Sequence, residues 1–180
     1  MANWCSNTVT FEGPEDRLKT LYKLFLKMAK LQTATGKGQI FPLFQNVNED
    51  ISYLFNIYLS DEENPVGGYI QFETKWSPDP TSFMLIANMF DVSFTYQAEE
   101  MSMGIYCEYK YDPKDCTLYT RELTDEESDS AKSCEEHGTQ CRLDDCDRYE
   151  DWDVMDNILE KKEWIVSDYP VPTKYKLEYE

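Results

Sequence analysis

The chain has 180 residues, of which 41% are hydrophobic and 14% aromatic, so it can bury a substantial core and is too apolar to be a disordered chain. Its formal net charge of −18 gives it an anionic surface that repels the phosphates of nucleic acids and membrane lipids. The charge is uneven, because residues 121–160 hold 15 Asp and Glu against 4 Lys and Arg, a net charge of −11. We therefore expect a globular protein whose acidity is concentrated in a late segment.

The first ten residues do not resemble an export signal, because polar side chains interrupt them and no cationic stretch precedes an apolar one. No apolar run approaches the roughly 20 residues that a membrane span needs. We expect a cytoplasmic protein, in which the six Cys are mostly reduced thiols or metal ligands and not disulfides.

The chain opens with a predicted strand and helix. Residues 6–12 alternate, with Asn7, Val9 and Phe11 on one face, which is typical of a half-buried strand. Apolar side chains then recur every three or four positions over residues 14–31, with Pro at the start and acids in the first turn, which predicts a helix.

Two strands, a second helix and two further strands follow. Alternation predicts strands at 53–59, 69–75, 92–98 and 105–111, and helical spacing predicts a helix at 81–90. The order strand, helix, strand, strand, helix, strand is that of the ferredoxin-like split βαβ arrangement. We therefore predict an α+β sandwich in which two helices cover one face of an antiparallel sheet, extended by extra strands, while the other face stays open.

Beyond this core the pattern weakens. The later segments are an edge strand, an exposed acidic insertion, a helix and a terminal strand, predicted at residues 118–123, 124–147, 149–163 and 175–179. We divide the chain into a ferredoxin-like core, 1–111, and a C-terminal extension, 112–180, packed on the core as one globular unit.

Two short motifs carry a resemblance to a known family. The N-terminal MANWCSN and the later TKWSPDP resemble elements of the YubB-type ferredoxin-like domain family of phage and plasmid proteins, over about residues 1–111. In the second motif, Asp79 stands between two prolines where the family has WSPP. The resemblance implies a ferredoxin-like fold and an origin on a mobile element of a bacterial host, with no established activity, catalytic residues or cofactor. We expect Trp4 to pack over the edge of the core and Cys5 to be a small buried side chain.

One cluster has the residue types of a structural zinc site. Cys134, His137, Cys141 and Cys146 lie within thirteen residues, and zinc binds four such sulfur and nitrogen ligands in a tetrahedron. The spacing matches no standard zinc finger, so the alternative is a set of thiols in a solvated acidic loop. No other cofactor is predicted.

Enzyme chemistry has little support in the sequence. His137 is the chain's single His, so a His acid or base would have to lie in the acidic insertion. Asp151 and Asp153 could hold a metal for hydrolysis, although acids in a helix's first turn commonly complement its dipole. The acids from Asp125 onward have offsets that resemble a calcium loop, but Ser130 stands where Gly is needed. We expect no enzyme.

Proteins of this topology can bind RNA through aromatic side chains on the central strands. The outward positions of those strands are expected to be Thr8, Thr10, Glu12, Tyr69, Gln71, Glu73 and Lys75. They offer one ring and several acids, so we expect no direct nucleic-acid binding.

The leading hypothesis is a non-enzymatic mobile-element protein that binds a host protein. An acidic surface could occupy a basic nucleic-acid-binding groove by imitating phosphate charge, as an anti-defence inhibitor would. The predicted contacts are acids of the insertion: Asp125, Glu126, Glu127, Asp129, Glu135, Glu136, Asp144, Asp145 and Asp147. The plainer alternative is that these acids only keep a loop soluble.

A second hypothesis is a structural or regulatory module that assembles through the open sheet face or the late helix. The helix residues concerned are Trp152, Met155, Ile158 and Leu159. The oligomeric state itself cannot be predicted from these patterns.

Overall fold

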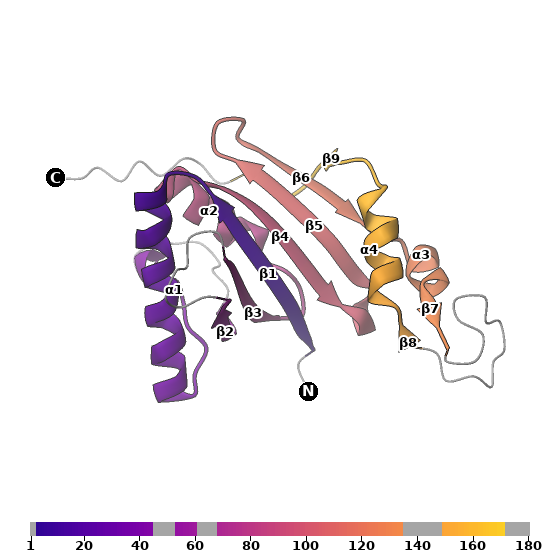
Figure 1. The fold of residues 1–180 in the computed structure, drawn as a ribbon, viewed down its shortest axis with the longest axis horizontal. Coiled ribbons are helices and arrows are strands. Elements are labelled where there is room, and N and C mark those ends of the chain that lie inside the picture. The colour runs from indigo at the N-terminus through magenta and orange to yellow at the C-terminus, as the bar shows by residue number, and fades with distance from the viewer. Residues whose placement is uncertain (1–2, 45–52, 61–67, 135–148, 172–180) are drawn as a thin grey trace.

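The computed structural model describes residues 3–44, 53–60, 68–134 and 149–171. Within these residues, seven strands form an antiparallel sheet of order β2-β3-β1-β4-β5-β6-β9, and β7 pairs with β8 in a smaller sheet. The helices α1 and α2 pack on one face of the large sheet and α4 on the other (Figure 1).

The N-terminal part is a ferredoxin-like unit. Its elements in chain order are β1 (Trp4–Glu12), α1 (Glu15–Thr35), β2 (Phe55–Leu59), β3 (Tyr69–Lys75), α2 (Pro80–Phe90) and β4 (Ser93–Glu100). Strand β1 lies between β3 and β4, with Val9 opposite Ile70 on one side and Tyr96 on the other. The strand order 2-3-1-4 is the one that two split βαβ connections produce. The predicted ferredoxin-like α+β fold is confirmed.

The main core lies between this sheet and the helices α1 and α2. Alternation along β1 buries Val9 and Phe11, and helical spacing along α1 buries Phe25. Phe83 of α2 stacks on Phe72 of β3, with ring centroids 4.9 Å apart. Each fully buried side chain of this size contributes roughly 2 kcal/mol to folding, so the aromatic layer fixes how the two helices sit on the sheet.

Helix α2 begins at the Asp that separates the two prolines. The Asp79 carboxylate accepts the Ser82 N–H at 3.1 Å and the Ser82 hydroxyl at 2.6 Å, which satisfies a donor of the first turn. Pro80 follows at the start of the helix, where a missing N–H costs nothing. The departure from the WSPP pattern therefore provides the N-cap of α2.

Strand β2 contains a β-bulge that the alternation pattern did not reveal. The register shifts between Phe55 and Tyr58, and Asn56 has φ of 49°. Because the bulge adds a residue, Leu54 and Ile57 both face the core. Phe55 and Tyr58 consequently both project from the opposite face.

The sheet continues beyond the ferredoxin-like unit. Strands β5 (Ile105–Asp112) and β6 (Thr117–Glu122) extend it from β4, which confirms the strands predicted at 105–111 and 118–123. A short strand, β9 (Ile165–Val166), pairs with the outer edge of β6. It was not predicted, and the strand predicted at 175–179 lies outside the described residues.

The segment predicted as an exposed insertion is folded where it begins. Helix α3 (Asp125–Ser130) has a capping box between Thr124 and Glu127, and β7 (Lys132–Ser133) pairs with β8 (Tyr149–Glu150). The late helix α4 (Trp152–Glu160) starts three positions after the predicted residue 149, because β8 occupies the first two of those positions and Asp151 is the N-cap.

Helix α4 covers part of the face that was expected to stay open. Met155 and Leu159 are buried with Tyr106, Leu123 and Ala131 in a second, smaller core. The expectation of an open face is therefore wrong over β5 and β6, because the apolar side of α4 needs a surface to pack on. It holds over β1 and β3, whose outward side chains are exposed or half-buried.

The outward side of α1 is basic. Lys19, Lys23, Lys27 and Lys30 recur every three or four positions and are all exposed. In the part of the chain that the structure describes, no helix is long and apolar enough to span a membrane.

Candidate functional site

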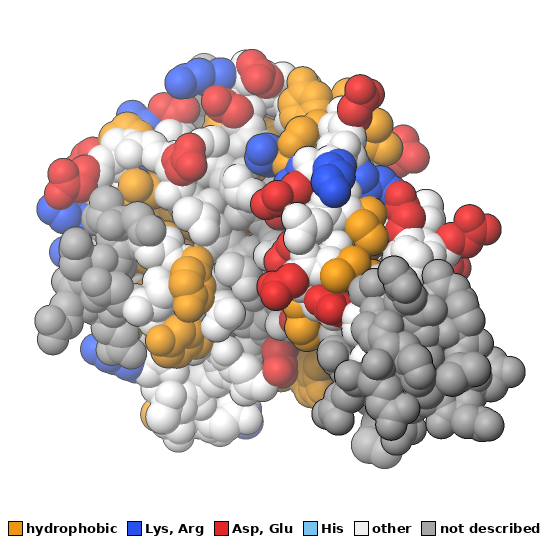
Figure 2. Space-filling model, turned by 45° about the vertical axis from the view of Figure 1, so that its right-hand side comes forward, with side chains coloured by type: hydrophobic (Ala, Val, Ile, Leu, Met, Phe, Trp, Pro, Cys, Tyr) orange, Lys and Arg blue, Asp and Glu red, His pale blue; other side chains and the backbone are white. Residues whose placement is uncertain are grey.

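The open face is the side of the large sheet opposite α1 and α2. Strand register places on it Ser6, Thr8 and Thr10 of β1, Gln71 and Glu73 of β3, and Thr95, Gln97 and Glu99 of β4. The outward positions expected for β1 and β3 are thus correct. Figure 2 shows a strip of uncharged polar groups between a hydrophobic patch and a ridge rich in carboxylates.

Aromatic rings gather on the open face toward the β2 edge of the sheet. Trp4 meets Phe55 edge to face, with ring centroids 4.9 Å apart at 68°, and the Lys75 Nζ lies 5.4 Å from the centre of the Phe55 ring. Tyr58 and Tyr69 are also exposed. The expectation that Tyr69 is the one ring available here is wrong, because the bulge in β2 turns Phe55 outward and Trp4 joins it.

The neighbouring Cys5 is buried, as expected, and points to the other side of β1. Burial raises the pKa of its thiol to about 11. The thiolate is therefore rare at neutral pH, and Cys5 acts as a small apolar side chain.

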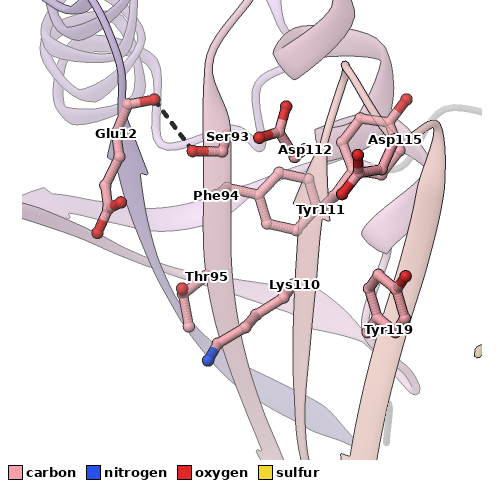
Figure 3. A pocket seen from close by; sticks show the side chains of 9 residues that line it. All are labelled: Glu12, Ser93, Phe94, Thr95, Lys110, Tyr111, Asp112, Asp115 and Tyr119. Atoms are coloured by element: carbon pink, nitrogen blue, oxygen red, sulfur yellow. Dashed lines mark hydrogen bonds between the residues drawn. The ribbon is translucent and has the colours of Figure 1, made fainter. Parts of the chain in front are cut away.

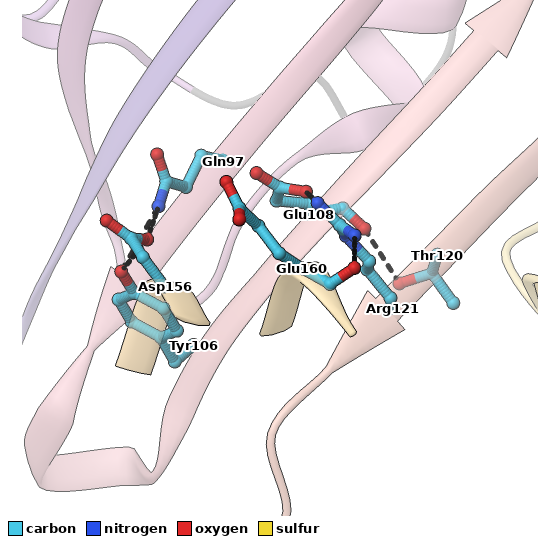
Figure 4. A network of polar contacts seen from close by, with 7 residues as sticks. All are labelled: Gln97, Tyr106, Glu108, Thr120, Arg121, Asp156 and Glu160. Atoms are coloured by element: carbon cyan, nitrogen blue, oxygen red, sulfur yellow. Dashed lines mark hydrogen bonds and ion pairs between the residues drawn. The ribbon is translucent and has the colours of Figure 1, made fainter. Parts of the chain in front are cut away.

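A polar contact fixes the first half of α4 to the open face. Asp156 Oδ1 accepts the Tyr106 hydroxyl at 2.6 Å and the Gln97 side-chain amide at 3.3 Å (Figure 4). Burial, with the adjacent Asp156, raises the pKa of Tyr106. The hydroxyl consequently remains a hydrogen-bond donor across the ordinary pH range.

Arg121 of β6 holds the end of α4 through a hydrogen bond and pairs with β5. Arg121 donates to the Glu108 carboxylate at 2.7 Å and to the Glu160 carbonyl oxygen at 3.0 Å (Figure 4). The guanidinium also lies 4.7 Å from the centre of the Trp164 ring, and the Lys110 Nζ lies 4.2 Å from it. Both cations are therefore engaged with the chain itself.

A pocket of about 250 Å³ lies between the sheet and the start of α4. It is lined by Ser6, Thr8, Gln71, Gln97, Glu99, Tyr106, Trp152 and Asp156. Trp152 packs on Tyr106 with ring centroids 5.8 Å apart and is 43% exposed. Burial raises the pKa of Glu99, the Ser6 hydroxyl opposes this, and the charge on Asp156 adds to it.

A second pocket, of about 370 Å³, lies at the other end of the open face (Figure 3). Its lining combines the Lys110 amine with the carboxylates of Glu12, Asp112 and Asp115, in front of aromatic rings. Because charges of both signs line it, this pocket favours no single class of ion.

Three of the predicted partner contacts are exposed on α3. They are Asp125, Glu126 and Asp129, of which Asp129 pairs with Lys132 at 2.7 Å. Five others lie outside the described residues: Glu135, Glu136, Asp144, Asp145 and Asp147.

Glu127 has a structural role that the sequence analysis did not assign. Its carboxylate accepts the Thr124 N–H at 2.8 Å and forms an ion pair with Lys162 beyond α4. The Lys162 ammonium and then the Thr124 N–H hold the pKa of Glu127 below its ordinary value. Glu127 thus caps α3 and ties it to the segment after α4.

The candidate zinc ligands are not brought together within the described residues. Cys134 is buried, whereas His137, Cys141 and Cys146 lie outside those residues. No group of three or more His, Cys, Asp or Glu that could hold a metal occurs among the residues described. The zinc site stays a prediction.

The other two metal hypotheses meet specific obstacles. Of the acids offered as a calcium loop, Asp125, Glu127 and Asp129 lie on helix α3, and Glu136 lies outside the described residues. A helix cannot wrap its side chains around an ion as an EF-hand loop does, so the structure gives this interpretation no support. Asp151, offered for hydrolysis, accepts the Val154 N–H at 3.2 Å and the Ser133 hydroxyl at 2.8 Å. It serves as the N-cap of α4, while Asp153 is exposed.

The exposed carboxylates of α3 and α4 form one acidic ridge. Its members are Asp125, Glu126, Asp129, Asp153, Asp156 and Glu160. The two helices pack on a common core and are joined by the Glu127–Lys162 ion pair. The acids of the ridge on α3 are among the predicted contacts, whereas those on α4 and the pocket beside them were not predicted from the sequence.

The chain was compared with models of protein families. The model described as the ferredoxin-like domain in Api92-like protein matches residues 54–147, just over half of the chain. The chain belongs to this family. In this Api92-like family member the matched residues begin just before β2 and extend past β7. The description of the family model names a fold and no reaction. Comparisons with curated proteins and with solved structures give no match. The ferredoxin-like part of the expected resemblance is supported, whereas the YubB-type name and its motifs stay predictions.

Proposed function

We propose that this protein is a non-enzymatic binding module that docks a basic partner protein on its acidic ridge. The proposal rests on the fixed position of the two helices that carry the ridge. Its acids project from two helices that are anchored to each other and to the sheet. Charges held at fixed positions lose less conformational freedom on binding than charges on a loop, and they fix the register of a complementary surface.

The finer proposal concerns the partner. It is a host protein with a basic nucleic-acid-binding groove, in which the ridge imitates the spaced charges of a phosphate backbone. A phage or plasmid protein acting in this way in the bacterial cytoplasm would serve as an anti-defence inhibitor. The sign of the ridge, the net charge of −18 and the resemblance to mobile-element proteins support this.

A capture experiment with a charge-matched control tests the ridge. The immobilised protein is exposed to bacterial lysate, as wild type and as the triple variant Asp125→Lys, Glu126→Lys, Asp129→Lys. The control carries the same change of charge at exposed acids elsewhere: Glu12→Lys, Asp16→Lys and Asp115→Lys. We expect the triple variant to lose the specific partner and the control to retain it, and capture by wild type to weaken in high salt.

Equal capture by both variants would show that the ridge acids only solubilise the chain. Mimicry is tested separately by adding duplex DNA to the purified complex. Displacement of the chain by DNA supports occupation of a nucleic-acid groove, whereas a complex that resists excess DNA refutes mimicry and leaves protein binding intact.

A second candidate function is assembly through the aromatic side of the open face, favoured by the exposure of Trp4, Tyr58 and Tyr69. Assembly through α4 is not supported, because Met155 and Leu159 of that helix are buried. Light scattering after size exclusion separates the cases. A stable oligomer that dissociates on Tyr58→Ser would favour assembly, and a monomer at all concentrations would exclude it.

A further inference from the structure

The described residues that line the pocket beside α4 include two carboxylates, Glu99 and Asp156. Glu99 reaches it from β4 and Asp156 from α4, and no Lys or Arg is among the described residues that line it. The hydrogen-bond donors that reach these two carboxylates are neutral, namely the hydroxyls of Ser6 and Tyr106 and the Gln97 amide. Two carboxylates that share a partly desolvated space favour a bound cation.

Two cations that lie on the same face over β5 and β6 are engaged elsewhere. Arg121 is shared between Glu108 and the Glu160 carbonyl, and Lys110 lies on Trp164. On the far side of Ser6, Glu73 faces the same surface and accepts the Asn56 amide at 2.6 Å. It adds negative charge to this part of the open face.

The exposed ring of Trp152 in the pocket favours a cation that can stack on an aromatic side chain. Trp152 lines the pocket and has 43% of its surface exposed, while its ring is held against Tyr106. A guanidinium is planar, carries forked donors that match carboxylates, and stacks on indole faces more readily than the strongly hydrated ammonium of lysine. A volume of about 250 Å³ also admits one side chain and not a folded element.

We propose that this pocket binds an arginine side chain of the partner protein, with the guanidinium stacked on Trp152 and hydrogen-bonded to Glu99 and Asp156. The inference deepens the proposed function and rests on it, since the pocket opens beside the acidic ridge and shares Asp156 with it. The ridge then attracts and orients the partner, and the pocket provides the buried anchor that centres an interface.

The test uses small probes and the intact chain. Nα-acetyl-arginine amide, the lysine analogue and the neutral, nearly isosteric citrulline analogue are titrated against the ¹⁵N-labelled protein, and the Trp152 indole N–H resonance is followed. Its assignment comes from Trp152→Phe. We expect saturable millimolar binding of the arginine probe, weaker binding of the lysine probe, and no saturable shift with citrulline.

Two conservative variants probe the carboxylates. Glu99→Gln and Asp156→Asn keep acceptors for Ser6, Tyr106 and Gln97, and Glu99→Gln removes a desolvated charge, so both are expected to fold. Each should weaken the arginine probe about tenfold, as the loss of one charge-assisted hydrogen bond predicts. The control Glu12→Gln removes an exposed acid at the far end of β1 and should leave the affinity unchanged.

Binding of the citrulline probe as tight as that of the arginine probe would refute the proposal that this pocket binds arginine. Unchanged affinity in both carboxylate variants would refute it as well. Failure of the pocket and failure of the proposed function are distinguishable. If the arginine probe fails while charge reversal on α3 still abolishes capture of the partner, only the pocket is wrong. If the probe binds and charge reversal on α3 has no effect, the ridge is not the docking surface.

Discussion

At the scale of single residues, the most consequential polar side chain is Asn7. It is 1% exposed, in the middle of β1. Its amide donates to the Cys5 carbonyl at 2.7 Å and to the Thr74 hydroxyl at 3.0 Å, and its oxygen accepts the Tyr96 hydroxyl at 2.7 Å. The Tyr96 hydroxyl in turn accepts the N–H of Asp79, the cap of α2. One amide thus links three strands and a helix start.

We predict that Asn7→Ala lowers the free energy of unfolding by roughly 2 to 4 kcal/mol, because it removes the acceptor of the buried Tyr96 hydroxyl and one partner of the buried Thr74 hydroxyl. The control Thr8→Ala, one residue along and on the open face, should cost less than about 1 kcal/mol. Urea denaturation measures both. A loss of stability that is the same for the two variants would contradict the network.

We predict that Glu99→Gln stabilises the protein at neutral pH. Burial raises the pKa of Glu99 in the folded chain, with Asp156 adding to the shift and Ser6 opposing it. The folded state therefore binds this proton more readily than the unfolded state, and the free energy of unfolding falls as the pH rises between the two pKa values. The variant's urea midpoint should exceed that of wild type at pH 7.

The advantage of Glu99→Gln should shrink as the pH falls toward 4, where both states of the wild type become protonated. Other groups face this carboxyl: Asp156 from α4, Tyr106 from β5, and Glu73 across Ser6 on β3. Glu12→Gln serves as control and should not change the midpoint. A lower midpoint than wild type at pH 7 would refute the assigned burial penalty.

At this scale, sequence patterns predict which way a side chain of a strand faces, but not which distant side chains it meets. Alternation correctly assigned Asn7 to the buried face and Thr8 to the open one, because strand periodicity is local. The meeting of Glu99 with Asp156 could not be predicted, since it depends on where α4 docks. Glu127 could have been recognised, because Thr124 stands three residues before it in the pattern of a capping box.

At the scale of elements, α4 determines how much of the sheet remains open. Its apolar stripe was visible in the sequence at Met155 and Leu159, and the structure buries both. Helical spacing predicts that such a stripe is covered, but not by which surface. The sheet face over β5 and β6 provides that surface, with Tyr106 and Leu123 as its apolar contacts.

We predict that Met155→Ala costs roughly 3 kcal/mol, the usual range for truncating a fully buried side chain, and exposes α4 to hydrogen exchange before the main core. The control Asn157→Ala changes an exposed residue of the same helix and should alter stability by less than about 0.5 kcal/mol. Denaturation and exchange mass spectrometry read out both. Exchange that accelerates equally in α1 and α4 would show that the two cores are not separable.

The elements that could not be predicted from the sequence have no repeating pattern of apolar residues. The strands β7, β8 and β9 have two residues each, too few to show alternation. The bulge at Asn56 reverses the alternation of β2 without a Gly or Pro to mark it. Long strands and helices, by contrast, were located to within a few residues, because their periods repeat.

At the scale of the whole molecule, charge is segregated. The lysine row of α1 and the acidic ridge of α3 and α4 lie at opposite ends (Figure 1). The described part of the chain is therefore an electric dipole as well as a polyanion, and its field differs in sign between the two ends. Averaged composition conceals this, because it reports the net charge and not its placement.

We predict that moderate salt stabilises the protein. A net charge of −18 disfavours the compact state through self-repulsion, which ions screen over about 10 Å at 0.1 M. The thermal midpoint should rise between about 10 and 150 mM KCl, a range over which the screening length falls several-fold. The triple variant Asp125→Lys, Glu126→Lys, Asp129→Lys should show a smaller rise. A midpoint that falls with salt in this range would mean that attractive pairs outweigh repulsion.

The position of α4 late in the chain has a consequence for synthesis. On the ribosome, β1 waits for β3 and β4 before it can pair on both sides, and Trp152 and Asp156 emerge well after Glu99. A nascent chain can thus complete its ferredoxin-like unit while the pocket beside α4 is still missing a wall. The sheet face over β5 and β6 stays uncovered until translation has passed α4, so Tyr106 and Leu123 lack their apolar cover on the nascent chain until that helix arrives.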